Sequence, residues 1–397
     1  MTTESENATP RGPLAGIRVV EIASMGPGPL CAMLLADLGA DVLRVDRARG
    51  GNVEGPGANP ATELLHRGRR SIAVDLKHPA GPEVVLGLVE QADALIEGFR
   101  PGVTERLGIG PEPCLERNPR LIYGRMTGYG QDGPMAQAVG HDINYLAYSG
   151  VLSMIGRHEQ PPTPPLNLVA DFGGGGFLLA LGVLAAIVER ERSGVGQVID
   201  AAMVEGAALL ATPFFGYLQA GTWLPERGVN IVDSGAPFYD SYETADGKWL
   251  AVGAIERHFY AALLELLGLG GEDLPDQYDE ASWPEMKRRF AAAIRTRTRD
   301  EWCRLADGVE ACVAPVIEPD EVEDDPHLRE RGAFVRHHGV LQPAAAPRFS
   351  RTPAALSLRP PLPGEHTAEA LADWGFDGSR IAELQAAGIV GRAESVV

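Results

Sequence analysis

The sequence predicts an α/β fold, with a large domain on a doubly wound parallel sheet and a second, small α+β domain. Short β-branched strands alternate with apolar helices along residues 17–126, as they do in parallel sheets. From Thr222 onward the composition shifts toward tryptophan, tyrosine and proline, and the pattern becomes that of a β-hairpin. At 397 residues, the chain is also too long for one small core.

The first unit of the large domain is a strand, a helix and a second strand. The pattern predicts a buried strand at residues 17–22, an apolar helix at 29–38 with Pro29 in its first turn, and a second strand at 42–46. A unit of this length predicts parallel strands joined by a right-handed crossover. Further strands are expected at residues 71–76, 94–97 and 121–126, with a helix at 81–91.

The later part of the chain predicts the remaining elements. An apolar helix is expected at 177–192, a strand at 194–200 and a helix at 201–210. A hairpin around Asp246-Gly247 opens the small domain. We expect its strands at residues 238–244, 249–253 and 313–316, and its helices at 257–267 and 283–307. A proline-rich return path at 342–363 then leads to helices at 364–372 and 379–387.

These elements divide the chain into five parts. We expect a disordered tail at residues 1–12, the large domain at 13–212, a linker at 213–236 and the small α+β domain at 237–330. Residues 331–397 are expected to form a second linker and a C-terminal part that rejoins the large domain.

Charge and composition exclude several classes of partner. The net charge is −19, so general attraction to nucleic acid or anionic lipid is not expected. The four cysteines lack metal-ligand spacing, which predicts free thiols and no metal site. The N-terminus is too polar for a signal peptide, and the apolar run at 177–188 is too short to cross a bilayer. We therefore expect a soluble, cytoplasmic protein without a membrane partner.

Basic residues follow the predicted strands of this acidic chain. Arg47 and Arg49 follow the second strand, Lys77 the third, and Arg100 and Arg106 the fourth. Ligands of such sheets bind at the carboxyl ends of the strands, so this clustering favours a polyphosphate ligand. Four more basic residues precede the third strand and could belong to the same cluster: His66, Arg67, Arg69 and Arg70. Scattered surface arginines are the alternative.

The stretch from Gly140 to Gly176 contains the candidates for catalysis. His141 and Asp142 lie on a predicted loop, and Asp171 precedes four glycines at 173–176. His141-Asp142 could instead be a helix N-cap, and Asp171 could cap the apolar helix that follows. Glu256, at the end of a predicted strand, could likewise cap the next helix.

A histidine, an aspartate and a glutamate near a polyphosphate site permit acid and base chemistry without a metal or redox cofactor. One candidate reaction is proton exchange at the carbon alpha to a thioester, with a base on one face and an acid on the other. Histidine suits one face because its pKa lies near neutrality. Aspartate suits the other if partial burial raises its pKa. The four glycines would let the thioester approach the backbone closely.

Several longer motifs resemble a known family, the class III coenzyme A transferase (CaiB/BaiF) superfamily, and within it the alpha-methylacyl-CoA racemases. The resemblance extends from about residue 13 to residue 390. Its most specific segments are PLAGIRVVE at 13–21, LGADV at 38–42, EGFRPGV at 97–103, GYGQDGP at 128–134, GHDINY at 140–145 and GEHT at 364–367. Transferase members usually carry an aromatic residue in place of His141, whereas racemase members have the histidine and the NLVADFGGG context of residues 167–175.

The resemblance implies roles for individual residues. His141 and Asp171 would be the acid/base pair on opposite faces of the alpha carbon, and Glu256 would orient the histidine. No separate cofactor is implied, because CoA is part of the substrate. The residues implied to contact the CoA thioester are Arg47, Val74, Asp75, Leu76, Lys77, Gly98, Phe99, Arg100, Arg106, Gly140, Asp142, Ile143, Asn144 and Tyr145.

The resemblance also implies an interlocked homodimer. Each chain would have a large Rossmann-like domain and a small domain joined by two long linkers, and the active site would lie between subunits. Glu256 would then come from the partner chain. The reaction would be epimerisation of 2-methylacyl-CoA thioesters. The alternatives are CoA transfer between carboxylic acids through a covalent Asp171 intermediate, and a catalytically silent acyl-CoA-binding protein.

Overall fold

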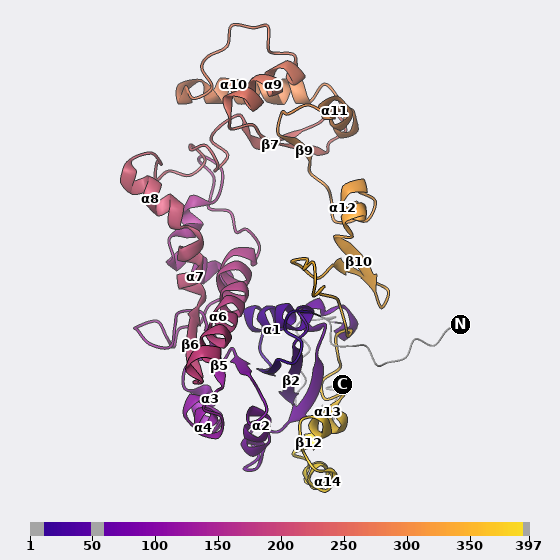
Figure 1. Ribbon diagram of the computed structural model, residues 1–397. Helices are drawn as coiled ribbons and strands as arrows, with labels where there is room; N and C mark the ends of the chain where they lie inside the picture. Colours follow the sequence, from indigo (N-terminus) through magenta and orange to yellow (C-terminus); the bar gives the residue numbers. More distant parts are fainter. Residues whose placement is uncertain (1–11, 49–58, 392–397) are drawn as a thin grey trace, which may run out of the picture. The chain divides into compact units, whose positions relative to one another are not determined.

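The structure is a computed structural model that describes residues 12–48 and 59–391 (Figure 1). The predicted tail, apart from Gly12, and the basic residue Arg49 lie outside the described residues. Within them the chain forms two compact units. Unit 1 contains the residues up to Ser149, Leu166–Leu210 and the residues from Arg329 onward. Unit 2 contains Gly150–Pro165 and Ala211–Leu328.

The division differs from the expected domains in one main respect. The chain leaves unit 1 after Ser149, contributes Gly150–Pro165 to unit 2 and returns at Leu166, an excursion that the sequence pattern did not reveal. The expected linker at 213–236 belongs to unit 2 and includes most of helix α8 (Thr212–Ala220). The other boundaries fall two residues from the expected positions, at 210 and 328.

Unit 1 is built on a seven-stranded, mostly parallel sheet, as predicted. Its strand order is β12-β3-β2-β1-β4-β5-β6. Strands β1 to β6 are parallel, and only the short edge strand β12 runs antiparallel, beside β3. The strands are β1 (Arg18–Ile22), β2 (Asp41–Arg47), β3 (Arg70–Val74), β4 (Ala94–Glu97), β5 (Ile122–Thr127), β6 (Gln197–Ala202) and β12 (Val390–Gly391).

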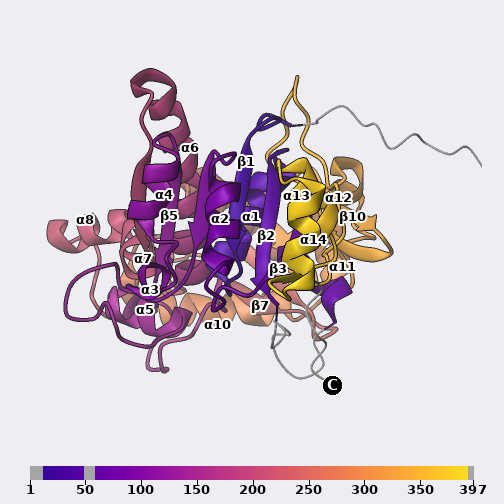
Figure 2. The ribbon, with the colours of Figure 1, turned by 90° about the horizontal axis from the view of Figure 1, so that it is seen from below.

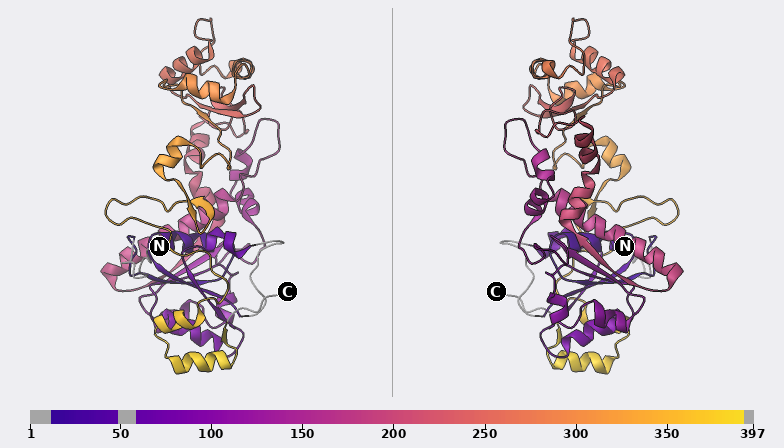
Figure 3. Two further views of the ribbon diagram at one scale, coloured as in Figure 1. Left: turned by 90° about the vertical axis from the view of Figure 1, so that its right-hand side faces the viewer. Right: turned by 90° about the vertical axis from the view of Figure 1, so that its left-hand side faces the viewer.

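Helices cover both faces of this sheet. One face packs Val20, Leu43 and Ile72 into the main apolar core against α2 (Gly81–Val89), α4 (Pro111–Arg117), α13 (Thr367–Asp373) and α14 (Gly378–Ala386). The C-terminal part therefore rejoins this unit, as expected, and Figure 2 shows α13 and α14 beside β2 and β3. Helices α1 (Pro27–Asp37) and α6 (Leu178–Ser193) cover the opposite face (Figure 3).

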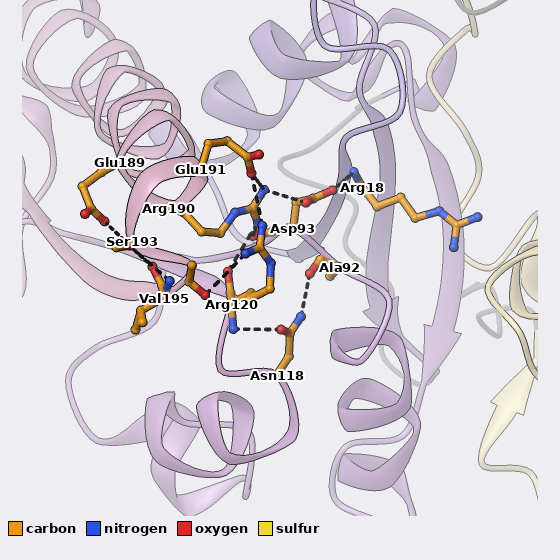
Figure 4. Close-up of polar contacts among 11 residues, drawn as sticks. Arg18, Ala92, Asp93, Asn118, Arg120, Glu189, Arg190, Glu191, Ser193 and Val195 are labelled. Carbon is orange, nitrogen blue, oxygen red and sulfur yellow. Dashed lines mark hydrogen bonds and ion pairs between the residues drawn. The ribbon is translucent and has the colours of Figure 1, made fainter.

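The predicted apolar helix begins earlier than its pattern suggests. A π-helix at Leu168–Phe177, labelled η4, continues directly into α6. The far end of α6 is fixed by Arg190, whose guanidinium donates to the carboxylate of Asp93 at 2.8 Å and to the carbonyls of Asp93 and Arg120 at 3.3 Å (Figure 4). Asp93 also accepts from the backbone N–H of Arg18 at 2.9 Å. One end of the long helix is thereby anchored to the amino ends of β1, β4 and β5.

The combined helix Leu168–Ser193 has 26 residues and is, among the described residues, the only one long and apolar enough to cross a membrane. The apolar run of twelve residues, on which the sequence analysis relied, is therefore only part of a longer helix. Core helices of soluble proteins share this property. Here α6 packs on the sheet, where Leu179 and Val183 fill the space over Gly124 of β5.

Unit 2 has a three-stranded antiparallel sheet of β7 (Tyr239–Glu243), β8 (Trp249–Gly253) and β9 (Val313–Pro315). Its core contains Phe238, Phe290 and Trp302. The helix expected at 283–307 is two helices, α10 (Trp283–Ile294) and α11 (Arg299–Ala306). Thr298 and Glu301 form a capping box that starts the second one.

The remaining elements are short. Unit 1 also contains α3 (Val103–Arg106), α5 (Asp142–Tyr148), α7 (Met203–Leu210) and the hairpin β10 (Phe334–His337) to β11 (Val340–Pro343). Helix α9 (Arg257–Leu267) belongs to unit 2, and α12 (Pro326–Arg331) lies where the chain passes from unit 2 to unit 1.

Candidate active site

His141 and Asp171 lie close together although 30 positions separate them in the chain. Asp142, the next residue after His141, accepts hydrogen bonds from the backbone N–H groups of Ala170 and Asp171, both at 2.8 Å. His141 is the N-cap residue of α5, reached by the loop that follows β5, and its side chain is exposed. Asp171 lies within the π-helix, so the interpretation of Asp171 as a helix cap is wrong. For His141, the cap interpretation describes the backbone position correctly.

The loop before His141 is held by a tyrosine. Tyr145 is buried, and its hydroxyl donates a hydrogen bond to the carbonyl of Gly140. Its ring occupies the space beside Gly128 and Gly140, where an added Cβ would lie 2.1 and 2.7 Å from a ring carbon. Burial, followed by the charge of Asp171, raises the pKa of Tyr145 to about 12. Asn144 completes the turn by accepting from the backbone N–H of His141 at 3.0 Å.

Asp171 is half-buried. Burial raises the pKa of its carboxyl, the nearby charge of Asp142 raises it further, and a hydrogen bond from Asn167 acts in the opposite direction. The Asn167 amide lies 3.4 Å from Asp171 Oδ2. Gly26, in the loop after β1, approaches this carboxylate closely: a Cβ there would lie 3.4 Å from the same oxygen. A carboxyl with a raised pKa can hold a proton nearer neutral pH, as acid/base work requires.

Three of the four glycines after Asp171 do not make room for a thioester, so for Gly174, Gly175 and Gly176 that expectation is wrong. Gly174, Gly175 and Gly176 are buried. A Cβ on Gly174 would lie 2.6 Å from the backbone of α7, and a Cβ on Gly175 or Gly176 would lie 2.9 or 2.8 Å from side chains of α1. These glycines therefore let the π-helix pack directly against α1 and α7.

Four cations stand at the carboxyl ends of the strands, as predicted. Arg47 ends β2, Lys77 follows β3, and Arg100 and Arg106 follow β4. All four are exposed, and none has an ion-pair partner within residues 12–48 and 59–391. Unpaired arginines at this edge can bind phosphate oxygens.

The basic residues before β3 do not belong to this cluster, so that part of the interpretation is wrong. Arg67 donates to Asp37 at 2.6 Å, and Arg70 lies 2.6 Å from Asp373 and 3.1 Å from Asp41. Arg69 is fully buried against Glu21. Burial, with the charges of two arginines, lowers the pKa of His66 to about 2. These side chains stabilise the fold and are not available to a ligand.

The predicted contact residues after β3 and β4 fall into two groups. Val74 belongs to the apolar core, Leu76 packs against it, and Asp75 accepts from the backbone N–H of Lys77 at 3.0 Å. They support the segment from within. Gly98 lies against Ser24, and the N–H of Phe99 donates to buried Glu97 at 2.7 Å. Gly98 and Phe99 are partly exposed, as is Gly140, whereas Ile143 and Asn144 are exposed.

Sequence reasoning missed the pair that holds the segment after β4. Glu97 accepts from Arg125 Nε of β5 at 2.9 Å, and the same guanidinium lies 2.8 Å from Glu105 of α3. Burial raises the pKa of Glu97. Two features of the sequence could have revealed this pair: a carboxylate at the end of an otherwise apolar strand, and an arginine inside the next strand.

Glu256 lies in unit 2, so no single unit brings it together with His141. It is the N-cap residue of α9 by backbone position, but its exposed side chain makes no cap hydrogen bond. The preceding carbonyl, of Ile255, is held by Gln277 and Tyr278 at 2.7 Å each. The Glu256 carboxylate therefore follows a turn whose backbone is held by two side-chain hydrogen bonds.

Comparison with known proteins shows the family to which the chain belongs. Residues 14–367 match CoA-transferase family III. The chain is 50% identical to the alpha-methylacyl-CoA racemase of Mus musculus and 48% identical to that of Homo sapiens, in each case over 95% of this chain and 97% of the relative. The crystal structure of a CaiB/BaiF family protein from Brucella suis superposes with a TM-score of 0.78 at 29% identity, covering 92% of this chain and all of that one. The chain therefore belongs to CoA-transferase family III.

Proposed function

We propose that this protein is an alpha-methylacyl-CoA racemase, which interconverts (R)- and (S)-2-methylacyl-CoA thioesters. The two racemases of about 50% identity support this activity over almost the whole chain. The structural observation that supports it is that hydrogen bonds to Asp142 hold exposed His141 and half-buried Asp171 on adjoining segments. Four exposed cations at the carboxyl ends of the strands, without an ion-pair partner among the described residues, support it further.

In the proposed reaction, His141 and Asp171 act on opposite faces of the alpha carbon. In one direction the imidazole removes the alpha proton, the C–H electron pair passes into an enolate, and protonated Asp171 delivers a proton to the other face. In the reverse direction the roles exchange. The raised pKa of Asp171 favours this exchange, because the carboxyl must be protonated in one direction and ionised in the other.

The substrate would be anchored by its CoA part, so that no further cofactor is needed. Arg47, Lys77, Arg100 and Arg106 would bind the phosphates. The direct contacts that we propose along the thioester are Gly98, Phe99, Gly140, Ile143 and Asn144. Val74, Asp75, Leu76, Asp142 and Tyr145 would support them from beneath, since the described structure has these residues packed or hydrogen-bonded within the protein.

We further propose a homodimer of chains with a Rossmann-like large domain, in which the partner subunit supplies the glutamate that orients His141. The parallel strand order 3-2-1-4-5-6 supports the description of the domain. Phe177, at the end of the π-helix, and Leu181 and Val188 of α6 form an apolar stripe whose residues are 56%, 64% and 63% exposed, which supports a partner on that face. We also propose a cytoplasmic location, which the four free cysteines support, since thiols stay reduced in that compartment.

CoA transfer through a covalent Asp171 intermediate is the second candidate, because the family includes transferases and Asp171 is accessible. The two reactions differ in whether they require His141. Transfer needs only the carboxylate, whereas epimerisation needs a base on each face.

Incubation of a single 2-methylacyl-CoA epimer in deuterium oxide tests the proposal. We expect inversion accompanied by incorporation of deuterium at the alpha carbon, and loss of both in the His141→Ala and Asp171→Asn variants. Wild-type protein that shows neither inversion nor exchange would refute the racemase proposal. Trapping of Asp171 by hydroxylamine during turnover, with activity retained in His141→Ala, would favour transfer.

A further inference from the structure

Asp142 connects the two segments that carry the acid/base residues. It is the first residue of α5, next to His141 in the chain, and its side chain is 5% exposed. One carboxylate oxygen, Oδ2, accepts hydrogen bonds from the backbone N–H groups of Ala170 and Asp171, both at 2.8 Å. A single oxygen thus joins the start of α5 to the π-helix turn that presents Asp171.

This connection matters because the chain between the two segments provides no short link. After α5 the chain leaves unit 1 at Gly150 and comes back only at Leu166. The relative placement of His141 and Asp171 must therefore be set by contacts across the segments. A small displacement of a catalytic group from the reactive geometry reduces the rate strongly, so a hydrogen bond at this position has more than a structural consequence.

The other oxygen, Oδ1, is buried and has no hydrogen-bond partner among the described residues. Burial of a carboxylate with one oxygen unsatisfied by the protein is unfavourable, so the two hydrogen bonds to Oδ2 are the contacts that hold this side chain in place. The negative charge also faces Asp171 and favours the protonated form of that carboxyl, as does burial. Asp142 therefore affects both the position and the charge state of Asp171.

We propose that Asp142 is a positioning residue for the epimerisation, whose carboxylate fixes the backbone of Asp171 relative to His141 and supplies a negative charge beside it. This inference rests on the proposed racemase activity. It differs from a role in contacting the substrate, because both carboxylate oxygens are enclosed by the protein.

Two substitutions test this role. Asp142→Ala removes both hydrogen bonds, and we expect kcat to fall roughly 100-fold with KM for the thioester changed less than about threefold, since the loss is one of geometry. Asp142→Asn keeps an acceptor oxygen and removes the charge. Its kcat should fall roughly tenfold. Whichever limb of the pH profile reports Asp171 should move to lower pH, because a neighbouring negative charge is gone.

The matched control is Asp132→Asn, the same chemical change at an exposed position of the loop before His141. It should have the kcat, KM and pH profile of the wild type. A merely structural role for Asp142 would lower the melting temperature without moving the pH profile of the folded protein. If Asp142→Ala does not fold, the pH profile of Asp142→Asn decides the question.

The outcomes separate this inference from the proposed function. Wild type and control that exchange the alpha proton, together with an Asp142→Asn variant of wild-type kcat and pH profile, would overturn the inference alone. Wild-type protein without exchange would overturn the racemase activity and this inference with it. A shifted profile with unchanged KM supports both.

Discussion

Basic side chains occur in two regions of unit 1, and the structure uses them differently. Arg47, Lys77, Arg100 and Arg106 stand exposed after the strands, and within the described ranges none has an acidic partner. Arg67 and Arg69, just before β3, and Arg70, its first residue, lie within 3.2 Å of carboxylate oxygens. The two sets are close in sequence and identical in charge, and only their surroundings distinguish them.

The difference shows how position relative to a strand decides the function of an arginine. Before a strand, the side chain lies over the sheet and meets the acidic residues of neighbouring elements, as Arg69 meets Glu21 of β1 and Arg67 meets Asp37 of α1. After a parallel strand, it stands at the edge where the ends of the crossover loops open to solvent. The paired arginines at the start of β3 can therefore be tested by measuring protein stability. The exposed cations after the strands can be tested by measuring substrate binding.

The largest effect is expected for Arg69→Met. This change leaves the carboxylate of Glu21 buried without its nearest cation. We expect the free energy of unfolding to fall by about 3–5 kcal/mol, as for other broken buried pairs. Urea denaturation measures it. The double variant Glu21→Leu with Arg69→Met should recover much of the loss, and a loss below about 1 kcal/mol in the single variant would contradict the structural role.

A smaller effect, on binding alone, is expected for Arg106→Ala and Arg47→Ala. Each should raise KM for the acyl-CoA roughly tenfold, which corresponds to about 1.4 kcal/mol, with kcat within about threefold of wild type. The free energy of unfolding should change by less than about 0.5 kcal/mol. Arg192→Ala, an exposed arginine at the end of α6, is the control. An unchanged KM in both test variants would remove these residues from the binding site.

Salt should distinguish the same two sets. Raising the ionic strength from about 0.05 M to about 0.5 M screens exposed charges and affects buried pairs much less. We expect KM for the acyl-CoA to rise several-fold in the wild type and less in Arg47→Ala, with little change in the urea midpoint. Steady-state kinetics and denaturation at matched salt concentrations measure the two responses. Equal salt dependence of KM in the variant would show that Arg47 contributes no charge to binding.

Asp171→Asn removes activity in our proposal, but a small effect on thermal stability is expected of it, since Asp171 is only half-buried. Because burial raises the pKa of Asp171 in the folded protein, the ionised form is disfavoured there. The associated stability is complete below the unfolded-state pKa and is lost as the pH rises through the folded-state pKa. The variant should therefore melt at a higher temperature than wild type at pH 7, and the difference should vanish in acid. A lower melting temperature at pH 7 would contradict this assignment.

The fold was largely accessible from the sequence. The alternation of β-branched runs and apolar helices located β1 to β5 within one or two residues, because local patterning and burial on both faces agree there. The pattern failed where tertiary contacts override local preference. Four glycines between residues 173 and 176 argue against a helix, yet the π-helix forms because α1 and α7 pack directly on its backbone.

The candidate site was accessible only in part. His141, Asp171 and the exposed cations were predicted from residue type, motif and position after strands, and the structure shows where they lie while their roles stay predictions. Asp142 and Tyr145 were taken as ligand contacts, because a motif does not show which of its side chains turn inward. Gly26, Glu97 and Arg125 were missed, since their importance depends on which strands and loops become neighbours.

The sequence by itself determined the element types, the parallel sheet and the chemistry present at its carboxyl edge, because these follow from periodicity and residue type. The tertiary structure alone decided which charges are paired and which remain available. It also decided that one carboxylate oxygen of Asp142 ties His141 to Asp171 across an excursion into another unit. Pairing and burial depend on distances between segments far apart in the chain, and local sequence contains no record of those distances.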